Sequence, residues 1–203
     1  MDRIFGFGPD DGGSNPPGLV GFGKMVGKMK VFKTKKFILR PAKLSDAENI
    51  YKYQQDEGTQ KNFMSTPKNV EEVKKELRND FRDRKKPKNK RDGEEWTIEI
   101  DGEASGQISI YFHDKRNRSK AKLSAWIARK HRNKGIMTKI LKIFTGYTFK
   151  KYNLVRLEGY VREYNKPSAR MMEKAGYKLE GIIRKNQKKE GRYVNDLLYA
   201  KVK

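Results

Sequence analysis

The chain has 203 residues, of which 36% are charged and 35% hydrophobic, and this length fits one sizeable core. Its formal net charge of +23 favours anionic partners such as RNA, the ribosome or a phosphorylated ligand. The alternative is that the charge only reflects a lysine-rich proteome. The absence of cysteine excludes disulfides, thiolate nucleophiles and cysteine metal sites. No stretch approaches the roughly 20 apolar residues of a membrane helix and none has a signal-peptide pattern, so we expect a cytoplasmic protein without a membrane partner.

Residues 1–30 have a composition that opposes regular structure. They hold eight of the 18 glycines and the pair Pro16-Pro17. We expect a flexible N-terminal extension over 1–30 and one folded domain over 31–203, although Met25 and Met29 leave open a later natural start. The segment GLVGFGKM, from Gly18 to Met25, has the glycine and lysine spacing of a P-loop, but methionine replaces the hydroxyl that would bind magnesium, so we interpret it as a chance match.

The first expected elements are a strand and a helix. The run FILR, residues 37–40, is β-rich, and Ser45 and Glu48 then have the S-x-x-E spacing of a capping box. The sequence therefore predicts a helix that begins near Ser45.

A second helix is expected over residues 70–81. Asn69 and Glu72 repeat the cap signal, and apolar residues follow at three- and four-residue spacing. The segment FRDRKKPKNKR, residues 81–91, carries seven positive charges against one aspartate. We expect a helix end and an exposed basic loop there.

The second half of the chain alternates strands and helices. The runs EWTIEI and GQISIYF, joined through Asp101-Gly102, predict a hairpin. The later expected elements are a strand over 122–128, a helix over 136–147, a strand over 154–161, a helix over 165–174 closed by Gly176, and a hairpin around Gly191. This order predicts an α/β layer structure with a mixed sheet.

The segment HRNKGIMTK, residues 131–139, lies where a strand gives way to a helix. The first turn of a helix presents amide N–H groups without intrahelical partners, and the helix dipole adds positive charge, so anions bind there. Gly135 would let a ligand approach without meeting a Cβ atom, and Arg132, Lys134 and Lys139 would add charge. An ordinary basic helix start with a turn glycine explains the same residues equally well.

A family resemblance separates these two interpretations. RNKGIM, residues 132–137, resembles the R-x-x-G-x-(G/A) signature of the GNAT acetyltransferase superfamily, with Met137 in place of the usual small residue. NKPSARMMEKAGYKLEG, from Asn165 to Gly181, resembles the other cofactor-side helix of that superfamily. GRYVNDLLYA resembles the closing strand of its ribosomal-protein (RimJ/RimL-like) N-acetyltransferase branch. Together with FILRPAKLSDAENIY and GEASGQIS, the resemblance extends from about residue 36 to the end of the chain.

The resemblance implies a fold and a cofactor. The implied fold is one GNAT-like α/β domain, with a mixed, mostly antiparallel, twisted sheet whose central strands splay apart, here KLSAWIA and LVRLEGYV, flanked by helices. The implied acetyl donor is acetyl-CoA, with its pyrophosphate on backbone amides and its pantetheine arm along the open strand edge. Asn165 would lie near the arm and also cap its own helix. The implied cofactor-binding residues are Ile127, Ala128, Arg129, Arg132, Asn133, Lys134, Gly135, Ile136, Met137, Thr138 and Asn165.

The same resemblance implies direct attack of an amine on the thioester. Ser168, three residues after Asn165, matches the N-x-x-S of the ribosomal-protein branch and is the candidate acid, while Met172 stands where many relatives place a tyrosine donor. Glu94 is the candidate base, because its position resembles that of an acidic residue in the branch. Glu95, Glu99 and Glu158 compete for that role. An ordinary capping serine and a solvated surface carboxylate are the plain alternatives.

Metal and hydrolase chemistry are not expected. His113 and His131 are the only histidines and have no carboxylates at metal-ligand spacing. A Ser-His-Asp hydrolase would need a nucleophile elbow such as G-x-S-x-G, which the sequence lacks.

Three functions therefore compete. The first is acetylation of a primary amine, above all the α-amino terminus of a protein such as a ribosomal protein, because a basic enzyme can dock on ribosomal RNA. The second is acetylation of a small-molecule amine or polyamine, which the net charge would repel unless the pocket itself is acidic. The third is an RNA-binding module on the same fold, with 81–91 and 113–122 as basic contact segments. The sequence does not decide whether the protein is a monomer or a homodimer.

Overall fold

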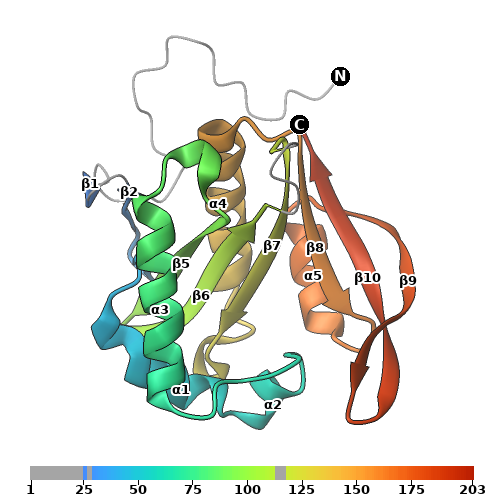
Figure 1. The fold of residues 1–203 in the computed structure, drawn as a ribbon. Coiled ribbons are helices and arrows are strands. Elements are labelled where there is room, and N and C mark those ends of the chain that lie inside the picture. The colour runs from blue at the N-terminus through green and yellow to red at the C-terminus, as the bar shows by residue number, and fades with distance from the viewer. Residues whose placement is uncertain (1–24, 27–28, 113–117) are drawn as a thin grey trace.

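The computed structural model describes residues 25–26, 29–112 and 118–203, and one eight-stranded sheet organises the folded part of them (Figure 1). Its strand order is β3-β4-β5-β6-β7-β8-β10-β9. Neighbouring strands are antiparallel except β7 and β8, which are parallel, so the predicted mixed and mostly antiparallel sheet is confirmed. The strands are β3 (Phe32–Lys33), β4 (Ile38–Pro41), β5 (Gly93–Ile100), β6 (Glu103–Tyr111), β7 (Lys120–Ile127), β8 (Arg156–Arg162), β9 (Lys178–Lys189) and β10 (Arg192–Val202).

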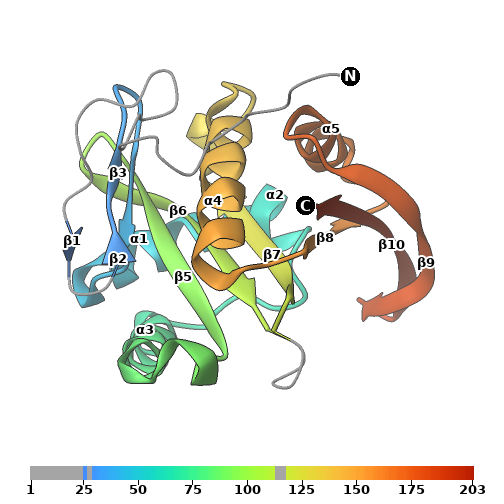
Figure 2. The same cartoon turned by 90° about the horizontal axis from the view of Figure 1, so that it is seen from above.

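Helices cover both faces of this sheet. The helices α1 and α3 lie on one face, where they contact β6 and β5, and α4 and α5 lie on the other, where both contact β8 (Figure 2). The α-helices are α1 (Ala47–Gln54), α2 (Glu57–Gln60), α3 (Val70–Lys85), α4 (Ile136–Tyr152) and α5 (Lys166–Lys174). Short 3-10 helices are η1 (Leu44–Asp46), η2 (Lys88–Lys90) and η3 (Arg129–His131).

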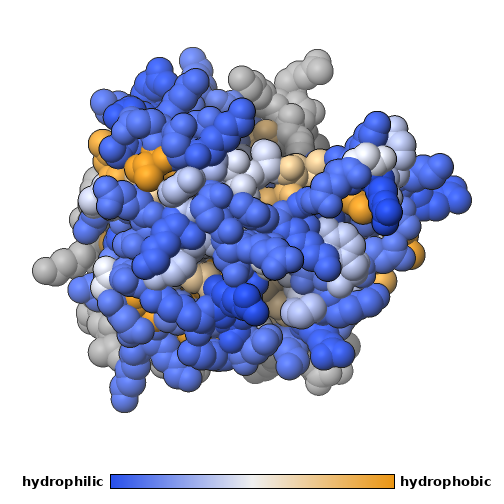
Figure 3. Space-filling view, turned by 90° about the horizontal axis from the view of Figure 1, so that it is seen from below, coloured by the Kyte–Doolittle hydropathy of each residue, from blue (hydrophilic) through white to orange (hydrophobic). Residues whose placement is uncertain are grey.

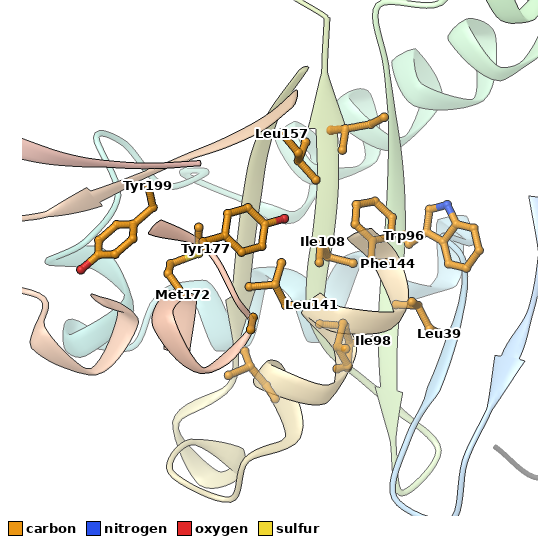
Figure 4. Packing of buried hydrophobic residues seen from close by; sticks show 14 of the residues in the cluster. Leu39, Trp96, Ile98, Ile108, Leu141, Phe144, Leu157, Met172, Tyr177 and Tyr199 are labelled. Carbon is orange, nitrogen blue, oxygen red and sulfur yellow. The ribbon is translucent and has the colours of Figure 1, made fainter. Parts of the chain in front are cut away.

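Each face of the sheet has its own apolar core. The larger core joins the sheet to α4 and α5, and Trp96, Leu141 and Phe144 are among its fully buried side chains (Figure 4). The smaller core joins α1 and α3 to the opposite face around Ile50 and Leu77. Burial of a side chain of this size stabilises the fold by about 1.5–3 kcal/mol, and the two cores together hold the strands that position the site.

Several sequence predictions are confirmed in detail. The β5–β6 hairpin turns at Asp101 and Gly102, whose φ angles of 52° and 80° match the two-residue turn that such a dipeptide favours. Asn69 caps α3, because its side-chain oxygen accepts the backbone N–H of Glu72 at 2.9 Å. Helix α3 then extends to Lys85, four residues beyond the predicted end.

Other predictions are wrong at the level of individual contacts. The Ser45 capping box does not form; the chain enters α1 through η1, and the carboxylate of Asp46 accepts the N–H of Lys43 and pairs with Arg40. In the basic segment 81–91, Arg91 is buried rather than exposed, because its guanidinium donates to the carbonyls of Lys86 and Arg84. In both places, polar contacts with residues three to seven positions away replace the expected arrangement.

The N-terminal predictions fall largely outside the described residues. Of the predicted extension 1–30, only β1 (Met25–Val26) and β2 (Met29–Lys30) are described, and they pair with each other. The P-loop-like segment lies outside apart from Met25, as does His113.

No helix among the described residues is long and apolar enough to cross a membrane. The face seen in Figure 3 is mostly hydrophilic, with small hydrophobic areas recessed between polar residues, as the composition predicts.

Candidate active site

The first cavity of the site lies where β7 and β8 separate. The two strands pair in parallel only from Lys120 with Arg156 to Leu123 with Gly159, and beyond Leu123 strand β7 pairs with β6 alone. The predicted splay of the central strands is therefore present (Figure 1). It leaves one backbone edge of β7 free for an extended polar ligand, which could bond to it as an added strand does. A cavity of about 790 Å³ lies at this point.

The start of α4 forms one end of this cavity. Gly135 precedes the helix with φ of 71°, and Asn133 also has a positive φ, of 61°. A Cβ atom added at Gly135 would meet no heavy atom within 4 Å, and Gly135 itself lines the cavity. The first amide N–H groups of α4 have no intrahelical partner and carry the positive end of the helix dipole. The geometry fits the phosphates of a nucleotide cofactor.

Most of the predicted cofactor-binding residues line this cavity. Ala128 does not, because it is fully buried and its N–H bonds to the carbonyl of Ser105 at 2.7 Å. Lys134 is exposed and also lies outside the lining. The predicted cofactor-binding residues that do line it are Ile127, Arg129, Arg132, Asn133, Gly135, Ile136, Met137, Thr138 and Asn165, and the candidate acid Ser168 lines it as well.

Met137, which departs from the family signature, has two environments. It is half-buried, packs against the larger core and also contributes to the wall of the first cavity. Core packing therefore holds part of its side chain. This explains how a larger residue fits at a position where a small one is usual.

Arg132 lines the cavity, but its guanidinium is already bonded. It donates to the carbonyl of Ile127 at 3.1 Å, to Asp56 and to the hydroxyl of Thr59. The side chain thus ties α2 to the start of α4. The Arg132 guanidinium is therefore already engaged, whereas the backbone amides at the start of α4 have no intrahelical partner.

Helix α2 is the part of this cavity that the sequence analysis missed. Gly58, Thr59, Asn62 and Phe63 line the wall beside it. The segment QDEGTQKN has no apolar periodicity, so only the Asp56 to Thr59 cap spacing could have revealed the helix. Its carbonyls accept bonds from Tyr164 and Lys189, which fasten it to the C-terminal half of the chain.

Helix α5 contributes Asn165 and Ser168 to the opposite wall. The side chain of Asn165 accepts the backbone N–H of Ser168 at 3.3 Å, so its predicted capping role is confirmed. Ser168 is half-buried and is one of the residues that line the cavity. Met172 is instead buried against β8, where a Cβ atom on Gly159 would lie 2.5 Å from its Cε atom. Met172 is therefore a packing residue.

Glu94 does not lie in the cavity with the other predicted residues. Side chains alternate along a strand, and Glu94 faces α4, where it is buried and bonded to Tyr147, Lys151 and Tyr152. The Nε1–H of Trp96 also donates to it, at 2.7 Å. A carboxylate saturated by four neighbours and closed to solvent cannot reach a substrate. The structure does not support Glu94 as the base.

Glu95, the next residue, lies on the other face of β5 and lines a second cavity of about 340 Å³. Gln107 donates to its Oε1 at 2.5 Å, and Trp126 Nε1–H fixes that amide by donating to its oxygen at 3.0 Å. Burial raises the pKa of Glu95 to about 8, and the nearby Asp80 carboxylate adds to the effect. Such a group can exchange a proton near neutral pH.

The two cavities adjoin each other, because Phe63 and Trp126 line both. The other competing carboxylates are bonded elsewhere. Glu99 pairs with Arg40 at 2.5 Å, and Glu158 is held by Arg156 and Tyr160. Of the predicted candidates for the base, Glu95 is therefore the one that lies beside the cofactor cavity. In the described ranges, no group of three or more His, Asp or Glu side chains could hold a metal ion.

Comparisons with known proteins place this geometry in a family. A family model described as "Acetyltransferase (GNAT) domain" matches residues 36–178. The chain is 35% identical over 86 residues to the "Probable N-acetyltransferase YjcK" of Bacillus subtilis (strain 168), which is 42% of this chain and 48% of that protein. The alignments span about half the length of the curated relatives that the chain matches.

Solved structures show the same fold at low identity. The ribosomal-protein-S5-alanine acetyltransferase from Vibrio fischeri superposes with a TM-score of 0.76 at 19% identity, covering 85% of this chain and 96% of that one. The microcin C7 self immunity acetyltransferase MccE, in complex with acetyl-CoA and AMP, superposes with a TM-score of 0.74 at 19% identity, covering 84% and 94%.

Proposed function

The chain belongs to the GNAT acetyltransferase family, and from that premise we propose that it transfers the acetyl group of acetyl-CoA to a primary amine, the α-amino terminus of a protein. The observation that carries the proposal is the adjacency of two cavities. One has an open strand edge and a helix start that fit a phosphate-bearing cofactor, and the other has a carboxylate with a pKa of about 8. Their shared wall would bring donor and acceptor together.

Residues already described would hold the cofactor. The amides at the start of α4, from Gly135 to Thr138, would bind its phosphates, and the free edge of β7 near Ile127 would bond to its amide-bearing arm. When bound, acetyl-CoA supplies the thioester carbonyl carbon that the amine attacks. The rest of the chemistry is proton transfer by side chains of this chain.

Glu95 and Ser168 would divide the proton transfers. An ammonium must lose its protons before or during attack, and an ionised Glu95 accepts one, since its pKa of about 8 matches a neutral operating pH. A C–N bond forms as the C–S bond breaks, and Ser168 donates its hydroxyl proton to the departing sulfur. The second proton that the nitrogen loses passes through solvent and restores the serine hydroxyl. Ser168 lies on the first cavity and Glu95 on the second, as donor and acceptor sides require.

Two observations support a protein acceptor. The ribosomal-protein acetyltransferase named above has the same fold, and a formal net charge of +23 would favour docking on ribosomal RNA or an acidic protein surface. A small-molecule amine is the second candidate, because the acceptor cavity has a volume of only about 340 Å³. A cytoplasmic location and the ribosome association stay predictions.

An acetyl-transfer screen tests the proposal. The full chain is incubated with acetyl-CoA and a panel of N-terminal peptides and small amines, and mass spectrometry locates the acetyl group. Modification of the α-nitrogen of peptides supports the protein acceptor, and modification of small amines alone supports the second candidate. Absence of transfer to every amine, with no acetyl-CoA binding, would overturn the proposed function.

A further inference from the structure

The acceptor cavity is acidic although the chain is strongly basic. The lining of this cavity holds three carboxylates, Glu72, Glu76 and Glu95, and one cation, Lys68. The whole chain has 48 Lys and Arg residues against 25 Asp and Glu residues, so the local balance is the reverse of the overall one. A concave site lined by one sign of charge focuses its potential. This cavity will attract cations that the outer surface repels.

Helix α3 supplies most of the acidic wall. Glu72, Glu76 and Asp80 follow one another at four-residue spacing, which places them on one face of the helix. Like charges at this spacing destabilise a helix. Asp80 is paired with Arg84, and Glu72 accepts the N–H of Lys68 at 2.8 Å. Glu76 has no hydrogen-bond or ion-pair partner among the described residues.

Repulsion between neighbouring carboxylates contributes to the raised pKa values of Glu76 and Glu95. Burial raises the pKa of Glu76, and the neighbouring Glu72 carboxylate raises it further. Both Asp80 and Glu76 also raise the pKa of Glu95. The chain thus keeps several carboxylates close together and leaves Glu76 without a cation. A ligand that brings positive charge would relieve this repulsion.

The residues around Glu95 hold its side chain at the cavity without pairing its carboxylate with a cation. Gln107, which is only 8% exposed, donates to Oε1 of Glu95, and the described residues supply no hydrogen bond to its other oxygen. The guanidinium of Arg84 donates to the backbone carbonyl of Glu95 at 3.2 Å and pairs with Asp80. One oxygen of Glu95 is therefore free to receive an ammonium, and Glu76 on the α3 wall is free to receive another.

Resting on the proposed function, we propose that the acceptor is an amine with a second positive charge, whose reacting ammonium binds Glu95 while the second cation binds Glu76 beside Glu72. The shared chemistry is that of a diamine. It is present in a free aliphatic diamine and in a peptide whose N-terminal residue has a basic side chain. The expectation that net charge repels such acceptors does not apply inside this cavity, where carboxylates predominate.

Matched acceptor pairs test this proposal. At saturating acetyl-CoA, kcat/KM is measured for 1,4-diaminobutane against butylamine, and for a peptide with N-terminal lysine against the same peptide with N-terminal norleucine. Each pair differs mainly in the second charge. We expect a preference of about tenfold or more for the dication in at least one pair. A preference in the first pair alone identifies a free diamine, and a preference in the peptide pair identifies a basic N-terminal residue.

Two variants assign the preference to Glu76. Glu76→Gln should lower kcat/KM for the dication about tenfold more than for its monoamine partner. Glu71→Gln is the matched control, because Glu71 lies on the same helix and is exposed like Glu76, but it pairs with Lys74 at 2.7 Å and does not line the cavity. This control should keep the wild-type preference.

The outcomes separate this inference from the function on which it rests. Equal kcat/KM within both pairs, or an unchanged preference in Glu76→Gln, would overturn the second-charge proposal while the observed transfer upholds the acetyltransferase. Absence of transfer to all four acceptors, together with no binding of acetyl-CoA, overturns both.

Discussion

The two adjoining cavities are built in different ways. Many residues that line the cofactor cavity lie close together in the sequence, between 125 and 138, and the others come from the α2 region and from α5. The proposed phosphate-binding groups are backbone amides at the start of α4, next to Gly135. The acceptor cavity is formed by side chains from α1, α3, β5, β6 and β7, among them Gln54, Glu76 and Glu95. A cofactor common to a family can be bound by a conserved geometry of the backbone, whereas an acceptor peculiar to one enzyme must be recognised by side chains.

The largest expected effect is the loss of acetyl-CoA binding when a substitution alters the cofactor cavity alone. Gly135→Glu places a carboxylate in the anion site and strains a residue with φ of 71°, a cost of about 1–3 kcal/mol. Acetyl-CoA at 100 times its Kd stabilises the native wild type by about 2.7 kcal/mol, which raises the melting temperature. The variant should show no such rise. Gly191→Glu is the control for strain, since Gly191 also has a positive φ, of 79°, and no atoms near its Cβ position.

The next effect separates catalysis from cofactor binding. Glu95→Gln removes the group expected to accept the proton of the amine, and turnover should fall about 1,000-fold. The wild-type rate should rise with pH through a limb near 8, because Glu95 accepts a proton only when ionised and its pKa is about 8. The variant should lack that limb. A pH profile of kcat/KM that is the same in both proteins would rule out Glu95 as the base.

Glu94 and Glu95 provide a sharper contrast, because adjacent carboxylates face opposite sides of one strand. Glu94→Gln breaks a buried ion pair with Lys151 at 2.7 Å, and such a change lowers the free energy of unfolding by about 3–5 kcal/mol. Denaturant unfolding should show this loss while turnover of the folded variant stays near the wild-type value. A large loss of turnover without loss of stability would return Glu94 to the mechanism.

The smallest expected effect concerns the wall of α5. Ser168→Ala removes the proposed proton donor to the sulfur, and turnover should fall about 100-fold with acetyl-CoA affinity little changed. The backbone N–H of residue 168 still bonds to Asn165, so the helix cap is retained. Steady-state kinetics with titrated acetyl-CoA measures both quantities. Unchanged turnover would remove Ser168 from the mechanism.

The contrast between the cavities also explains what the sequence could predict. The order of elements and the glycine at the start of α4 follow from local patterns, because caps, turns and helix starts are encoded by neighbouring residues. The choice between Glu94 and Glu95 depends on which face of β5 packs against α4, which no local pattern records. The sequence could not predict the acidic wall either, because Glu72 and Glu76 line the same cavity as Glu95 only once α3 packs on the sheet.

The decisive measurement is calorimetry of acetyl-CoA binding to two variants, Gly135→Glu and Glu95→Gln, under the same conditions. It tests whether the two cavities have separate roles. We expect Glu95→Gln to bind acetyl-CoA with the wild-type Kd although its turnover is lost, and Gly135→Glu to show no binding. Loss of binding in Glu95→Gln, or retained binding in Gly135→Glu, would contradict the assignment of the cofactor to the first cavity and the amine to the second.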